Sequence, residues 1–263
     1  MKRKTLIRYG LTLVTASVAL IGRDVAAQAP DNKPNTTTMT ADAAGSAASP
    51  PTKENQAAMT PDSALAELKA GNARFAAGHQ AQRDHRGDVK TTASGQYPFA
   101  VVLSCLDSRV PIEIVLDQGI GDIFSARVAG NVLDDDILGS IEFGCKASGA
   151  KLIAVIGHSS CGAIKGAVDD VKLGKLSDLL SKIKPAIKQV SADVQPRTSK
   201  NSDFVDKVAE ANVRLVMQQV RERSPILREM LDKREIGLVG GIYELSTGEV
   251  HFFDKIDRHK PKG

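Results

Sequence analysis

The sequence contains no tryptophan, and aromatic residues make up only 4% of its 263 positions. It has three cysteines, too few for the dense disulfide framework that stabilises small secreted domains. The formal net charge is only +4, from 35 basic and 31 acidic residues. Because charges nearly balance and aromatic rings for stacking on bases are scarce, the composition argues against a nucleic-acid-binding module. With 42% hydrophobic residues, the chain can build a core, which excludes collagen-like, coiled-coil and fully disordered proteins.

Long hydrophobic runs are also lacking, and the most suggestive apolar stretch lies near the N-terminus. Four basic residues precede it, namely Lys2, Arg3, Lys4 and Arg8. The uncharged run then spans residues 9–22, which is short of the roughly 20 residues that a membrane-spanning helix needs. Small residues follow, and Ala27-Gln28-Ala29 is typical of a signal-peptidase cleavage site. The pattern predicts a signal peptide over residues 1–29.

A mature chain beginning near Pro30 would lie outside the cytoplasm. We expect it in the periplasm, with secretion as an open alternative and an uncleaved membrane anchor as a less favoured one. After cleavage, we expect no association with the membrane. Five basic residues and one acidic residue belong to the predicted signal peptide, so the remaining chain is neutral overall. The small excess of basic residues in the whole chain therefore gives no reason to expect a nucleic-acid partner.

Residues 30–57 are rich in Thr, Ala, Ser, Pro and Asn and hold almost no large apolar side chains. Such a segment cannot build a core, so we expect a disordered linker there and a folded domain over residues 58–263. Thr60 followed by Pro61 predicts a helix start, and Gly78 predicts its end. Leu65, Leu68, Asn72 and Phe75 recur on one face of this helix. We expect that face to pack on a partner subunit, making this an N-terminal dimerising helix.

The rest of the domain alternates between strand and helix patterns. Unbroken apolar runs predict buried strands at residues 99–104, 123–129 and 151–157. Helical spacing predicts helices at residues 134–148, 161–172, 177–190 and 203–221. A pair of strands around a turn is predicted at residues 238–244 and 249–253. The fold class is therefore α/β, with a mostly parallel central sheet flanked by helices.

Two strands of this sheet end in residues that bind metals. Cys105 follows the strand at residues 99–104, and His158 follows the strand at residues 151–157, with Cys161 three positions later. Two thiolates and one imidazole form a good donor set for zinc, and a three-residue set leaves the fourth position open. A Cys105–Cys161 disulfide is the alternative in an exported chain, although it would not explain His158. We expect Cys145, on an apolar helix face, to be a core residue.

The segment Cys105-Leu106-Asp107-Ser108-Arg109 adds an acid and a base to the first strand end. Asp107 lies two residues beyond a candidate ligand, so its carboxylate could reach the fourth position of the metal. Arg109 has the fork geometry to bind that carboxylate and keep it away from the metal. A plain ion pair within a loop is the alternative interpretation. The other histidines, His79, His85, His251 and His259, stand in polar or terminal contexts and predict surface side chains.

Together, Cys105–Arg109 and His158-Ser159-Ser160-Cys161-Gly162 resemble the paired signature of β-class carbonic anhydrases, and Arg127-Val128-Ala129-Gly130-Asn131 resembles the stretch between the two motifs. The resemblance covers about residues 60–253. It implies one Zn²⁺ per chain, held by Cys105, His158 and Cys161, with Asp107 as a competing fourth ligand. It also implies that Asp107 and Arg109 form a catalytic dyad.

The activity implied by the resemblance is the reversible hydration of carbon dioxide to bicarbonate and a proton by zinc-bound hydroxide. A homodimer or higher assembly is also implied. Some family members bind regulatory bicarbonate through Trp, Arg and Tyr; Arg127 matches that Arg, but the chain lacks Trp, so the usual pocket is absent. In plant-type members a Gln assists the substrate; Gln118 lies one position away, and its role stays open.

Three alternatives compete with carbon dioxide hydration. The same site could act on carbonyl sulfide or carbon disulfide, which the sequence does not distinguish. A non-catalytic zinc protein is less favoured, because a closed structural site needs a fourth strong ligand and no Asp–Arg pair. A nucleic-acid module is the weakest alternative, because the charges nearly balance and aromatic residues are scarce.

Overall fold

The structure is a computed structural model, and it describes residues 50–253 of the chain. The predicted signal peptide, most of the predicted linker and His259 lie outside the described residues, so those predictions are not tested by the structure.

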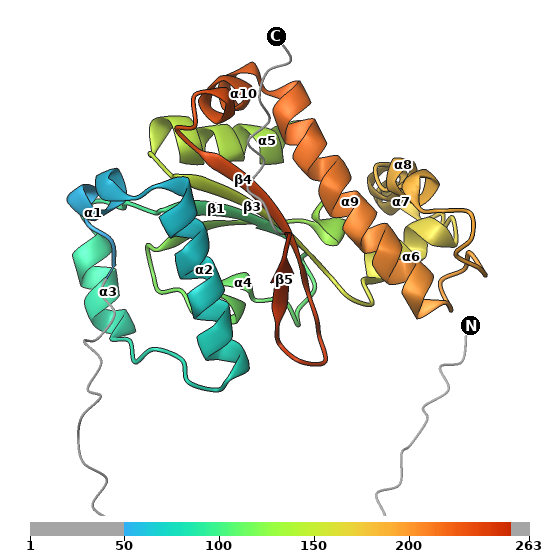
Figure 1. Cartoon of the computed structure of the whole chain (residues 1–263), viewed down its shortest axis with the longest axis horizontal. Helices are drawn as coiled ribbons and strands as arrows, with labels where there is room; N and C mark the ends of the chain where they lie inside the picture. The colour runs from blue at the N-terminus through green and yellow to red at the C-terminus, as the bar shows by residue number, and fades with distance from the viewer. Residues whose placement is uncertain (1–49, 254–263) are drawn as a thin grey trace, which may run out of the picture. The chain divides into compact units, whose positions relative to one another are not determined.

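Five strands of the described part of the chain form one sheet in the order β2-β1-β3-β4-β5 (Figure 1). The strands are β1 (Ala100–Ser104), β2 (Ile123–Arg127), β3 (Leu152–His158), β4 (Gly237–Tyr243) and β5 (Val250–Phe252). The first four run parallel, and β5 pairs antiparallel with β4. All residues of β1 and β3 are buried, as their unbroken apolar sequences predict. The predicted mostly parallel sheet is therefore confirmed.

Helices cover both faces of this sheet (Figure 1). Helices α2 (Pro61–Ala76) and α4 (Ile112–Val115) pack on one face, against side chains such as Val102 and Ala154. On the opposite face lie α5 (Asp135–Glu142), α9 (Ser202–Arg223) and α10 (Pro225–Asp232). They contact the alternate strand residues, such as Val101 and Ile153. The period of two along a strand thus divides its side chains between two apolar cores.

A third apolar cluster lies beyond the carboxyl ends of the strands. Helices α6 (Gly162–Val168), α7 (Gly174–Ser181) and α8 (Lys184–Gln189) pack there with the first half of α9. This cluster includes Cys105 and Cys161. The predicted helix over residues 161–172 is shorter than expected, because Asp170 adopts a left-handed conformation with φ of 51°. The predicted helix over residues 177–190 is divided into α7 and α8, with a proline at the start of α8.

Three helices of the described chain were not predicted from the sequence. They are α3 (His85–Thr92), α4 and α10. A 3₁₀ turn spans Ala129–Asn131, and a π-helical turn over Phe143–Ala147 ends the helix that begins with α5. The predicted strand over residues 123–129 therefore stops at Arg127.

The boundary of the predicted linker is wrong at its C-terminal end. Residues 53–57, assigned to the linker, belong to α1 (Lys53–Ala58). Thr52 caps this helix by accepting a hydrogen bond from the Asn55 backbone N–H. The buried Gln56 side chain donates to the carbonyl oxygens of Pro98, at 2.7 Å, and Ser148, at 2.8 Å. A helix poor in apolar residues is thus held on the domain by polar contacts that composition does not predict.

Helix α2 has the predicted bounds, and part of its apolar stripe is covered by the chain itself. Thr60 caps the helix, and Leu65 and Leu68 are buried against the chain's own sheet. Asn72 donates to the Val115 and Gly248 carbonyls. Leu65 and Leu68 are therefore covered within the same chain, whereas Phe75 stays partly buried. Contact of this helix with a second copy stays a prediction.

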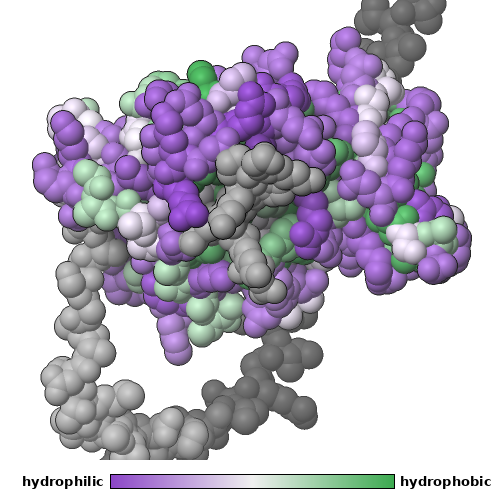
Figure 2. Space-filling view, turned by 45° about the horizontal axis from the view of Figure 1, so that its top comes forward, coloured by the Kyte–Doolittle hydropathy of each residue, from purple (hydrophilic) through white to green (hydrophobic). Residues whose placement is uncertain are grey.

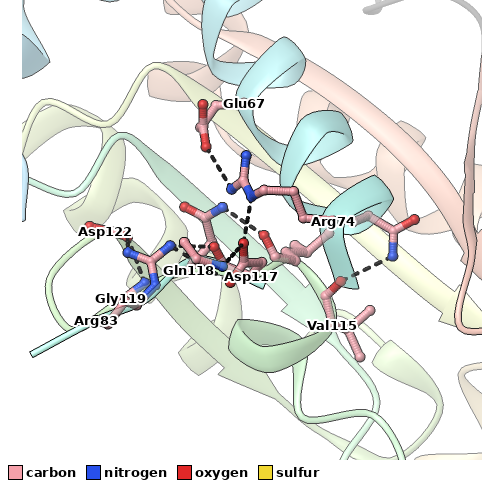
Figure 3. A network of polar contacts seen from close by, with 11 residues as sticks. Glu67, Arg74, Arg83, Val115, Asp117, Gln118, Gly119 and Asp122 are labelled. Atoms are coloured by element: carbon pink, nitrogen blue, oxygen red, sulfur yellow. Dashed lines mark hydrogen bonds and ion pairs between the residues drawn. The ribbon is translucent and has the colours of Figure 1, made fainter. Parts of the chain in front are cut away.

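A polar network ties α2 and the coil after it to the segment that follows α4 (Figure 3). Arg74 donates to Asp117 at 2.5 Å, and Arg83 donates to the Asp117 carbonyl at 2.5 Å. The Gln118 side-chain amide donates to the Leu116 carbonyl oxygen at 2.7 Å, so Gln118 belongs to this network. At Gly71 a Cβ atom would lie 1.9 Å from the Leu116 carbonyl oxygen, so only glycine permits this approach. The chain leaving the Asp107–Arg109 segment is thereby anchored.

The surface matches this burial of apolar side chains. On the face shown in Figure 2, hydrophilic residues predominate and hydrophobic residues form small, separate patches. Among the described residues, none of the helices combines the length and hydrophobicity required to span a membrane.

Candidate metal centre

Parallel pairing of β1 and β3 brings the candidate ligands together. Ser104 of β1 lies opposite Ile156 of β3, so Cys105 emerges beside the end of β3 at His158. Cys161 follows after a tight turn and is the N-cap residue of α6. All three residues are buried. The carboxyl ends of parallel strands meet at one edge of the sheet, which is where ligands bind in such folds.

The three ligand atoms have the spacing of a metal site. They lie within 4.8 Å of one another, and the two Sγ atoms are 4.0 Å apart. Zn–S bonds of about 2.3 Å at a tetrahedral angle place two sulfur atoms roughly 3.8 Å apart, so the pair needs to move little to bind zinc. Both cysteines are free thiols, so the structure does not contain the alternative disulfide.

His158 presents one ring nitrogen to this site. Its Nδ1 lies 2.9 Å from the Ser159 carbonyl oxygen. Because a carbonyl oxygen only accepts, we assign the proton to Nδ1, which leaves the Nε2 lone pair available. Nε2 is buried and has no hydrogen-bond partner. An orphaned imidazole nitrogen between two thiols is the observation that best fits a zinc ion at this position.

The two thiols differ in their electrostatic surroundings. The hydrogen bond with Cys161 lowers the pKa of the Cys105 thiol, and contacts with His158 and the Gly130 backbone N–H lower it further. The same pairing with Cys105, together with burial, raises the pKa of the Cys161 thiol. Cys105 therefore ionises first, and its Sγ accepts the Gly130 N–H at 3.3 Å. A thiolate held in this way is ready to bind a cation.

Asp107 and Arg109 form a two-pronged ion pair beside the donor set. Arg109 donates from Nε to Asp107 Oδ1 at 3.0 Å and from Nη2 to Oδ2 at 2.8 Å. The Arg109 guanidinium holds the pKa of the Asp107 carboxyl well below its usual range. Oδ2 also lies 3.9 Å from His158 Nε2, so the carboxylate borders the fourth ligand position. In this arrangement the carboxylate is bound by Arg109.

The structure brings together all four residues predicted as metal ligands, and Arg109 with them. Cys145 is separate and lies in the core packed under α5, as expected, where burial raises the pKa of its thiol to about 12. His79, His85 and His251 are exposed, as predicted.

The structure gives contacts of several supporting residues that the sequence does not predict. Arg127 is exposed and donates to the backbone carbonyls of Cys105, at 3.1 Å, and Asp107, at 2.7 Å. Ser159 donates to Glu244 at 2.9 Å, and the Ser160 N–H donates to Asp206 at 2.9 Å. Asn212 was the one supporting residue that the sequence signalled, because it lies on an apolar helix face. It is buried there, and a buried amide requires a hydrogen-bond partner.

Comparison with known proteins agrees with this geometry. The family model described as carbonic anhydrase matches residues 100–250. The chain is 36% identical over 200 residues to carbonic anhydrase 2 of Mycobacterium tuberculosis, covering 74% of this chain and 94% of the relative. A carbonic anhydrase of Mycolicibacterium smegmatis is also 36% identical, over 193 residues, covering 72% and 92%. The chain belongs to the carbonic anhydrase family.

Solved structures identify the class. A β-carbonic anhydrase of Aspergillus fumigatus superposes with a TM-score of 0.59 at 26% identity, covering 76% of this chain and 92% of that one. Tetrameric β-carbonic anhydrases of Sordaria macrospora share the fold, with a TM-score of 0.56 at 23% identity, covering 74% and 97%. This carbonic anhydrase is of the β class, and it is an enzyme of carbon dioxide hydration with zinc as its cofactor.

If the buried thiols are ligands, the chain's own third cysteine provides the control. We expect Cys161→Ser to lose most of its zinc, because a hydroxyl is a far weaker zinc ligand than a thiolate. Cys145→Ala removes a buried thiol away from the centre and should keep about one zinc per chain. Metal analysis of both purified variants checks this, and full zinc retention by Cys161→Ser would contradict the assignment.

Proposed function

We propose that this chain catalyses the reversible hydration of carbon dioxide to bicarbonate and a proton, with zinc held by Cys105, His158 and Cys161. The observation that carries this proposal is the orphaned Nε2 of His158, buried between two thiols and next to an Asp–Arg pair. Zinc, when bound, lowers the pKa of a coordinated water and so supplies a nucleophile near neutral pH.

Asp107 and Arg109 are the proposed catalytic dyad. While Arg109 binds both carboxylate oxygens, Asp107 stays off the fourth ligand position and can accept a hydrogen bond from the nucleophile there. Without Arg109, the carboxylate would be free to occupy that position as a fourth metal ligand and exclude water. Arg127 supports the dyad by holding the Asp107 carbonyl, which keeps the loop in register with β2.

Removal of Arg109 from the dyad should lower activity without loss of zinc. Arg109→Ala should lower kcat/KM for carbon dioxide hydration by roughly 100-fold or more, the size typical of losing one preorganised polar partner. Zinc content should stay near one per chain, because no donor atom has changed. Arg228→Ala, which removes an exposed arginine on α10, is the matched control. Stopped-flow hydration assays measure both, and near-wild-type activity in Arg109→Ala would reduce the dyad to a loop contact.

We further propose that the chain assembles as a homodimer or a higher oligomer. Exposed apolar side chains around the site support this proposal. Leu106, next to Cys105, is 57% exposed, and Ile114 on α4 is 56% exposed. These two side chains offer apolar surface, in and just after the Cys105–Arg109 segment, that a second subunit could cover. The β-carbonic anhydrases of Sordaria macrospora, which share the fold, are tetrameric.

A charge placed on this surface should break the assembly. Ile114→Glu should shift the mass measured by light scattering towards the monomer, since an interfacial carboxylate would be buried unpaired. Leu173→Glu changes another exposed apolar residue, 66% exposed between α6 and α7, and should leave the mass unchanged. A wild-type chain that is a stable, active monomer would contradict the proposal.

Export to the periplasm is also proposed, on the basis of the basic residues, apolar run and Ala27-Gln28-Ala29 site at the N-terminus. Expression of the full chain in a bacterium with two membranes should place the enzyme in the periplasmic fraction, with its N-terminus near Pro30. Recovery of the uncut chain from the cytoplasm would argue against export.

A further inference from the structure

The turn between two candidate ligands is held in a conformation that the backbone does not favour. Ser160, between His158 and Cys161, has φ of 54°, in the left-handed region that side-chain-bearing residues rarely adopt. Its N–H donates to Asp206 Oδ1 at 2.9 Å, and Asp206 comes from α9. Such a conformation persists only when surrounding contacts hold it. Asp206 therefore contacts the turn that leads directly into Cys161.

The other cysteine has a similar connection to the same helix. Gly130, with φ of 67°, directs its N–H at Cys105 Sγ, 3.3 Å away. Its carbonyl oxygen accepts a hydrogen bond from Asn212 Nδ2 at 2.8 Å. Asn212 is buried, and its own Oδ1 has no partner among the described residues. A buried amide that leaves one atom unsatisfied is unfavourable for stability, so packing alone does not account for asparagine at this position.

Helix α9 thus contacts the backbone next to each of the two cysteines. It lies beside α6 and the strand ends (Figure 1), and its apolar residues belong to two of the hydrophobic clusters. We propose that Asp206 and Asn212 are positioning residues that set the two sulfur atoms for metal binding, Asp206 through Ser160 and Asn212 through Gly130. This inference rests on the zinc site of the proposed function.

A structural role alone makes a different prediction from a positioning role. If Asp206 only stabilised the fold, its loss would lower thermal stability and leave the affinity and geometry of the bound metal unchanged. If it positions Cys161, its loss changes both metal properties. Removal of groups that orient metal ligands typically weakens metal binding by 10–100-fold. Metal affinity and the spectrum of a bound metal are therefore the measurements that separate the two roles.

The experiment compares Asp206→Leu, Asp206→Asn and a control. Leucine keeps the shape but removes the acceptor, whereas asparagine retains an oxygen that can accept the Ser160 N–H. Asp203→Leu, one turn earlier on α9, removes an exposed carboxylate that pairs with Lys207. Zinc affinity is measured by competition with a chelator. We expect Asp206→Leu to bind zinc 10–100-fold more weakly than the wild type, and Asp206→Asn and Asp203→Leu to stay within about threefold of it.

Cobalt(II) substitution tests the geometry independently of activity. The sulfur-to-cobalt charge-transfer bands report how the two thiolates are placed, so they should shift in Asp206→Leu and in Asn212→Leu and stay unchanged in Asp203→Leu. If Asn212→Leu does not fold, the comparison of Asp206→Leu with Asp206→Asn decides the result. Wild-type affinity and spectra in Asp206→Leu, or an Asp206→Asn as weak as the leucine variant, would overturn the inference. A wild-type chain that binds no zinc would instead overturn the proposed function.

Discussion

The parallel pairing of β1 with β3 is the constraint on which the rest of the site depends. It places the residue after β1 beside the last residue of β3, and so joins Cys105 to His158 across 53 positions of sequence. The register is held because both strands are buried on both faces. A slip of one residue would exchange the side chains between the two apolar cores, which makes such a slip costly. The metal centre therefore draws its precision from hydrophobic packing far larger than itself.

Burial controls the chemistry at this edge of the sheet. The thiols and the imidazole are enclosed, whereas Arg109 is 56% exposed at the side-chain level and Asp107 only 17%. The donor atoms thus lie in a dry environment, and the charged dyad lies at its border. Electrostatic interactions act more strongly where water is excluded, so the orientation of one carboxylate can decide access to the fourth ligand position. Exposed Asp–Arg pairs elsewhere on a surface contribute little by comparison.

Local motifs were strong enough to reveal much of this protein without coordinates. The apolar runs of β1 and β3, the capping residues of α2 and the periodicity of α9 correctly predicted their elements, because each pattern acts within a few neighbouring residues. The sequence also predicted that Cys105, His158 and Cys161 lie together, since the strand ends and the chemistry of these side chains point to one edge, and the structure brings them together. An error arose where a segment's partner lies far away in the sequence. Gln56 holds α1 on backbone carbonyls distant in the chain.

The sequence by itself determined the class of fold, the metal donor set and the Asp107–Arg109 pair, because these depend on short-range patterns and on the chemistry of the side chains. Only the tertiary structure decided which groups hold those residues in place. Asp206, Asn212 and Glu244 reach the site from elements that follow Cys161 by more than 40 positions, and no spacing rule connects them to it. Their contacts exist because α9 packs across the strand ends and β4 pairs with β3. Such contacts are a property of the assembled core, where hydrophobic packing determines which polar groups meet.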